Sequence, residues 1–160
     1  MLDWGDDVKL YLVQHAEAKT EQEDPSRGLS EKGVHDIEKT AHRAEGLLLK
    51  PSTIFHSGEK RAIQTAQILA ARLRPSHGVV KTGALAPMDD PGMWADRLSS
   101  VEEDIMLVGH LPHLAKLAGL LICGDQENRA ISFTMAGIAC FTRNKDGSWS
   151  VEWVLTPETV

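Results

Sequence analysis

Short β-branched runs alternate with helical patterns along the chain, and this alternation limits the fold more than any other feature of the sequence. Helical spacing of apolar residues predicts helices at residues 30–49, 59–73, 93–99 and around 114–121. Short apolar runs predict strands at residues 8–13, 53–56, 79–81, 104–108, 136–142 and 150–155. Alternation of this kind is typical of βαβ units. We therefore predict one α/β domain over residues 1–160, with three layers, α/β/α, and a mainly parallel central sheet.

The apolar spacing also predicts which face of each long helix is buried. For the first helix the expected buried residues are Val34, Ile37, Ala41, Ala44 and Leu48. For the second helix they are Ile63, Ala66, Ala70 and Leu73. Ser30 is a good N-cap, and residues 144–147 carry a hairpin turn signal that would pair the last two strands in antiparallel fashion.

Composition and charge exclude several classes of protein. The chain has 17 Lys and Arg against 23 Asp and Glu, a formal net charge of −6. This balance argues against a nucleic-acid binder and against docking on anionic lipid. The N-terminal residues 1–7 lack the features of a signal peptide, and no apolar run approaches the roughly 18 residues of a membrane span. Cys123 and Cys140 lie in apolar runs and are expected to be buried free thiols, which favours a cytoplasmic protein.

Chemically useful side chains follow three of the predicted strands. His15 comes after the first strand, Ser57 and Arg61 after the second, and His110 after the fourth. The carboxyl ends of parallel strands lie at one edge of a sheet, where open α/β sheets bind their ligands. Arg61 also falls in the first turn of a helix, whose N-terminus attracts anions. The sequence therefore predicts an anion site at this edge. A metal site built from His15, His56, His110 and His113 is a weaker alternative, because no metal-binding motif accompanies them.

Four motifs in order along the chain carry a resemblance to a known family. The first is Gln14-His15-Ala16, where the family usually has Arg-His-Gly or Arg-His-Ala. The others are residues 28–33 (Gly-Leu-Ser-Glu-Lys-Gly), residues 57–66 (Ser-Gly-Glu-Lys-Arg-Ala-Ile-Gln-Thr-Ala) and residues 108–112 (Val-Gly-His-Leu-Pro). With these motifs the chain resembles the small bacterial phosphohistidine phosphatases of the histidine phosphatase superfamily, which also contains the cofactor-dependent phosphoglycerate mutases.

The resemblance implies a phosphoglycerate mutase-like fold and a metal-independent phosphatase without a cofactor. It implies that His15 attacks phosphorus to form a phosphohistidine enzyme intermediate, and that Arg61 and a protonated His110 bind the phosphoryl oxygens. The expected substrate is a phosphohistidine on a protein partner, since no long insertion is present to form a lid over the pocket. Four further residues are expected to contact the substrate: Gln14, Ser57, Glu17 and Leu111.

Two departures from the family pattern affect the expected activity. Gln14 replaces an arginine that clamps phosphate, and the lost charge is worth about 1–2 kcal/mol. Lys19 and Lys60 are nearby basic residues that could compensate. A general acid has no clear candidate beyond Asp89, Asp90 and Glu17, although an imidazole leaving group needs little assistance. The alternative is a phosphoprotein-binding module that has lost catalysis.

Overall fold

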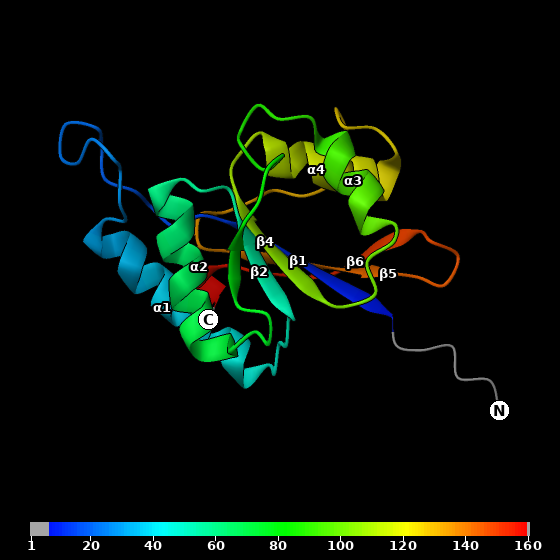
Figure 1. Ribbon diagram of the computed structural model, residues 1–160, viewed down its shortest axis with the longest axis horizontal. Helices are drawn as coiled ribbons and strands as arrows, with labels where there is room; N and C mark the ends of the chain where they lie inside the picture. Colours follow the sequence, from blue (N-terminus) through cyan, green and yellow to red (C-terminus); the bar gives the residue numbers. More distant parts are fainter. Residues whose placement is uncertain (1–6, 160) are drawn as a thin grey trace.

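The central sheet is built from six strands in the order β3-β2-β4-β1-β5-β6, in a computed structural model that describes residues 7–159 (Figure 1). The strands are β1 (Val8–Gln14), β2 (Thr53–His56), β3 (Val79–Lys81), β4 (Ile105–Gly109), β5 (Ile138–Arg143) and β6 (Trp149–Leu155). The helices are α1 (Glu31–Gly46), α2 (Lys60–Leu73), α3 (Pro91–Leu98) and α4 (His113–Cys123), followed by a 3-10 turn at Pro157–Thr159. Residues 1–6 and residue 160 lie outside the described residues. They include most of the N-terminal segment in which we expect no signal peptide, and the last residue of the predicted domain.

The sheet is mostly parallel, as the sequence predicts. β1 pairs with β4, β4 with β2, and β2 with β3, all in parallel, whereas β5 and β6 add antiparallel pairs beyond β1. The register sets Gln14 opposite Gly109 and His56 opposite Val108. The carboxyl ends of β1, β2 and β4 therefore meet at one edge of the sheet.

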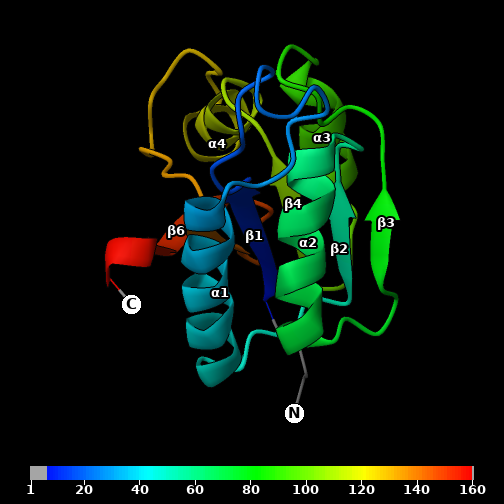
Figure 2. The same ribbon diagram turned by 90° about the vertical axis from the view of Figure 1, so that its left-hand side faces the viewer.

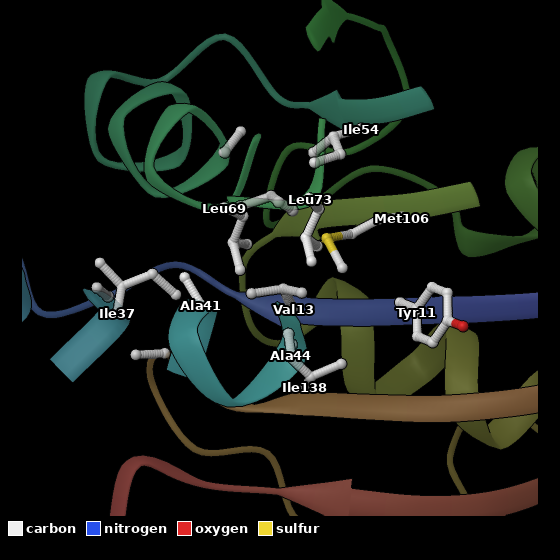
Figure 3. Close-up of a cluster of buried hydrophobic side chains, with 14 of the residues drawn as sticks. Tyr11, Val13, Ile37, Ala41, Ala44, Ile54, Leu69, Leu73, Met106 and Ile138 are labelled. Atoms are coloured by element: carbon white, nitrogen blue, oxygen red, sulfur yellow. The ribbon is translucent and has the colours of Figure 1, made fainter. Parts of the chain in front are cut away.

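Helices cover both faces of the sheet, which confirms the α/β/α arrangement. α1 and α2 lie side by side on one face (Figure 2), and their buried residues pack on Tyr11, Val13 and Met106 of the strands (Figure 3). α3 and α4 cover the other face, where Trp94 and Leu114 pack against the opposite side chains of β1 and β4. Burial of this apolar surface on both faces is the main source of stability.

Some predicted core positions are wrong. Val34 and Leu48 are 40% and 74% exposed. α1 ends at Gly46, and Leu48 takes a left-handed backbone conformation that turns it outward, so that Leu49 is buried instead. In α2, Ala66 and Leu73 are buried as predicted, whereas Ile63 and Ala70 are only partly buried. The remaining buried residues of this helix are Ala62, Thr65 and Leu69.

Cys123 is a further correction, because this thiol is exposed at the last residue of α4. Cys140 is buried in β5 as predicted, and both cysteines are free.

Gly33 allows the start of α1 to approach the segment that follows β1. A Cβ atom built at this position would lie 2.1 Å from the carbonyl oxygen of Glu17. Ser30 caps the helix just before this contact, its Oγ accepting a hydrogen bond from the Gly33 N–H at 3.0 Å. The contact fixes the N-terminus of α1 against the chain two residues beyond His15.

We expect Gly33→Ala to lower the free energy of unfolding by about 1–3 kcal/mol, because the methyl group overlaps a backbone atom. Gly46→Ala is the matched control in the same helix, since no atom lies within 4 Å of its built Cβ. The control should be neutral or stabilising by up to about 1 kcal/mol. Urea unfolding of both variants decides the matter, and equal stabilities would contradict the close approach.

Candidate active site

The turn that carries His15 is held by two neighbouring elements. The His15 N–H donates to the carbonyl of Gly109 at the end of β4, at 3.1 Å. The next N–H, of Ala16, donates to Oγ1 of Thr65 in α2 at 3.0 Å. Thr65 Oγ1 in turn donates to the carbonyl of Arg61 at 2.7 Å. These bonds place His15 between the ends of β1 and β4 and the first turns of α2.

The hydrogen bond of the His15 ring identifies its tautomer. Nδ1 lies 2.8 Å from the carbonyl oxygen of Ala16. A carbonyl can only accept, so Nδ1 carries the hydrogen and Nε2 of the neutral ring holds a lone pair. Burial lowers the pKa of His15, the bond to Ala16 partly offsets this, and the charges of Arg61 and Arg27 lower it further. The ring is therefore neutral near pH 7, with Nε2 available as a nucleophile.

His110 lies beside His15 and is almost completely buried. The two ring centroids are 5.0 Å apart, and only 2% of His110 is exposed. Its Nε2 lies 2.6 Å from Oγ of Ser57. Burial, followed by the influence of His15 and Arg61, lowers the pKa of His110 to about 3. The ring is thus neutral before an anion binds, and the predicted protonated form requires the charge of a bound anion to favour it.

Arg61 provides a cation at the N-terminus of α2. Its side chain is 14% exposed, and one guanidinium nitrogen lies 3.6 Å from the carboxylate of Glu59. Glu59 is the N-cap of α2 but makes no side-chain capping bond, and Pro112 precedes α4 in the same way. Helix N-termini without a side-chain cap retain N–H groups for an anion.

The other residues expected to contact substrate have different surroundings. The backbone carbonyl of Gln14 accepts a hydrogen bond from the Ala136 N–H. Its side-chain Oε1 is buried and has no hydrogen-bond partner within residues 7–159. Leu111, directly after His110, is 39% exposed. The Glu17 carboxylate accepts a hydrogen bond from Oγ of Ser30 at 2.6 Å, which engages it at the start of α1.

Asp89 and Asp90 hold the loop before α3 together. Asp89 accepts the N–H of Ala86 at 2.9 Å, and Asp90 caps α3 by accepting the N–H of Gly92 at 2.9 Å. These bonds account for both carboxylates as structural groups of the loop.

Arg27 belongs to the surroundings of this site, and the sequence reasoning missed it. Its charge lowers the pKa of His15, Arg61 and His110. The signal was its place directly before the second motif, which starts at Gly28. Lys60, one of the two lysines that could compensate for Gln14, has its ammonium 3.4 Å from the carboxylate of Asp24.

The four histidines of the metal alternative do not form a cluster. His56 Nδ1 accepts the N–H of Gly58 at 3.1 Å, and His113 is fully buried at the start of α4. Within residues 7–159 no three His, Cys, Asp or Glu side chains are grouped as the ligands of a metal ion.

Among the helices of residues 7–159 there is none with the length and apolar character of a membrane span.

We expect the ring of His15 to take up a proton at a higher pH than the ring of His110, and both below the ordinary value for histidine. Protonation of His15 should have its midpoint below the ordinary value of about 6.5, and His110 should remain neutral to below pH 4. Removing the nearby cation in Arg61→Ala should raise the midpoint of His15. Nitrogen NMR shifts across a pH series measure each ring. A His15 midpoint above 6.5, or Nδ1 without its hydrogen in the neutral ring, would contradict this geometry.

Solved structures of known proteins share this fold. The protein histidine phosphatase SixA, complexed with tungstate, superposes with a TM-score of 0.84 at 21% identity, over 94% of this chain and 97% of the other. A protein assigned as phosphohistidine phosphatase SixA from Agrobacterium tumefaciens gives 0.76 at 24% identity, over 94% and 98%. A mycobacterial glucosyl-3-phosphoglycerate phosphatase in complex with VO3 gives 0.71 at 15% identity, over 91% and 98%. This confirms the phosphoglycerate mutase-like fold.

Sequence comparison gives the family itself. The family model described as "Histidine phosphatase superfamily (branch 1)" matches residues 10–95, and this range includes the first three motifs. An uncharacterized protein of Picosynechococcus sp. (strain ATCC 27264 / PCC 7002 / PR-6) is 33% identical over 138 residues, covering 82% of each chain. The chain therefore belongs to branch 1 of the histidine phosphatase superfamily.

Proposed function

We propose that this protein is a phosphatase that removes the phosphoryl group from a phosphohistidine of another protein, through a phosphohistidine intermediate on His15. The observation that carries the proposal is the unprotonated Nε2 of a His15 ring that lies 5.0 Å from His110 and within the influence of Arg61. SixA, the neighbour bound to tungstate, is a protein histidine phosphatase, which supports this substrate class.

The reaction needs two displacements at phosphorus. In the first, the Nε2 lone pair attacks phosphorus while the bond to the substrate nitrogen breaks, and that nitrogen keeps the electron pair and takes a proton from the solvent, which the attacking water returns in the second step. In the second, water attacks phosphorus, inorganic phosphate leaves and the His15 ring is restored. The carbonyl of Ala16 stabilises the charged ring between the two steps, because it accepts the Nδ1 hydrogen throughout.

Charge stabilisation comes from groups already at the site. Arg61 can give two parallel hydrogen bonds to phosphoryl oxygens. His110 becomes a donor with charge once the phosphoryl dianion favours its protonated form. Ser57 holds the His110 ring through Nε2 until then. Asp89 and Asp90 stay in their loop bonds, which fits an imidazole leaving group that needs no strong acid.

The surroundings of the pocket fit a protein substrate. Leu111, beside His110, and Met135, bridged to Gln14, are 39% and 41% exposed. The proposal assigns these two exposed apolar side chains to contact with the protein that carries the phosphohistidine.

Gln14 favours a second candidate, a module that binds phosphoprotein without turning it over. The amide lacks the charge that the family arginine carries, so phosphoryl transfer has one cation fewer at this position. Release of phosphate from a phosphohistidine peptide separates the two candidates, since the module would bind the peptide and leave it intact.

We expect His15→Ala to abolish release of phosphate from a phosphohistidine peptide, because His110 is almost completely buried and its Nε2 is engaged by Ser57, which leaves His15 as the nucleophile. Arg61→Ala and His110→Ala should slow it by about tenfold or more each, the size of one charged hydrogen bond. His35→Ala, on the exposed side of α1, is the control and should match the wild type. Substantial turnover by His15→Ala would sink the mechanism.

Gln14→Arg tests whether position 14 faces the anion. The added charge should strengthen tungstate binding by about 1–2 kcal/mol, which is about 5–30-fold in the dissociation constant. Gln67→Arg adds the same charge on an exposed position of α2 and should leave the affinity within about twofold. Calorimetric titration gives both values. Equal affinities for the two variants would place the side chain of residue 14 outside the pocket.

A further inference from the structure

The loop between β1 and α1 folds back on the segment that follows His15. The Lys19 N–H donates to the carbonyl of Gly28 at 2.8 Å, and the Ser30 N–H donates to the carbonyl of Glu17 at 3.0 Å. The Leu29 N–H donates to Oε1 of Gln64 in α2 at 2.7 Å. Residues 27–30 therefore lie between the chain just beyond His15 and the helix that carries Arg61.

Arg27 adopts a backbone conformation that is unusual for its residue type. Its φ is +52°, in the left-handed region that residues other than glycine and asparagine rarely adopt. The turn before it is held by Asp24, whose carbonyl accepts the Arg27 N–H at 2.9 Å and whose carboxylate accepts the Gly28 N–H at 2.8 Å. Arg74 has the same φ, so it is the place of Arg27 in the loop beside His15, and not its backbone conformation, that points to the site.

One nitrogen of the Arg27 guanidinium, Nε, is held by a hydrogen bond, and the other two nitrogens are available to bind a ligand. Its Nε donates to the carbonyl of Lys19 at 3.0 Å. Its two Nη nitrogens have no hydrogen-bond or ion-pair partner in the part of the chain that the structure describes. Its charge acts on His15, Arg61 and His110 together, since it lowers the pKa of each of them.

We propose that Arg27 binds the phosphoryl group and supplies the positive charge that Gln14 does not provide. The guanidinium would approach the oxygens from the loop before α1, while Arg61 approaches from α2, so that two arginines share the anion without one at position 14. This assignment rests on the proposed function, because it concerns the same phosphoryl group.

The test uses Arg27→Gly, with Arg74→Gly as its matched control. Arg74 also has φ +52°, at the C-cap of α2, far along that helix from the site. Both substitutions remove one arginine and relieve one left-handed backbone, so neither should lower the melting temperature. Calorimetric titration with tungstate should show affinity reduced about tenfold or more for Arg27→Gly and unchanged for Arg74→Gly. Arg27→Asn, which tolerates the same backbone, should reproduce the loss.

A second arm tests the replacement of the charge at position 14. Adding Gln14→Arg to Arg27→Gly should restore tungstate affinity to within a few-fold of the wild type. Affinity of Arg27→Gly within twofold of Arg74→Gly would overturn the assignment, and a failure of Gln14→Arg to restore a lost affinity would overturn the replacement. Tungstate binding that depends on Arg27 without release of phosphate from a phosphohistidine peptide would instead overturn the proposed function alone.

Discussion

The hydrogen bonds that fix residues 15–17 determine the rest of the site. His15 is bonded to the end of β4, Ala16 to α2 through Thr65, and Glu17 to the N-cap of α1. One short segment thereby joins strand β1, which ends just before His15, to three other elements. Gly33 is needed for the same reason, because a side chain there would push the start of α1 off the carbonyl of Glu17. The position of His15 therefore depends on the packing of β1, β4, α1 and α2 at this edge of the sheet.

The charges at this edge oppose those of the protein as a whole. The chain carries a net charge of −6, yet Arg27 and Arg61 both act on the two histidines of the site. Burial and these cations keep both rings neutral. His15 therefore retains a lone pair, and the positive charge of the two arginines favours the binding of an anion. In the proposed reaction a phosphoryl dianion binds there, and its charge favours the protonation of His110. The neutral state of the free site and the charged state of the occupied site then follow from one arrangement.

Local signals were enough to predict most of the fold and part of the site. Periodicity located the helices and strands, and the rule that parallel strands end at one edge brought His15, Ser57 and His110 together. Periodicity could not give the order of the strands, because this depends on contacts between distant residues. Nor could it show that Leu48 turns outward after the last turn of α1, or that the Glu17 carboxylate is engaged by Ser30. Arg27 was missed because its position depends on a loop that folds back without any repeating pattern.

The attachment site of phosphorus is the most direct test of this account. The wild-type protein, with its histidines labelled with ¹⁵N, would be mixed with a low-molecular-weight phosphoryl donor and studied by ³¹P and ¹⁵N NMR. The account predicts one phosphorylated ring, that of His15, with phosphorus coupled to Nε2 and with Nδ1 still carrying its hydrogen towards the carbonyl of Ala16. Phosphorus on Nδ1, on another residue, or on no residue while phosphate is released would contradict it.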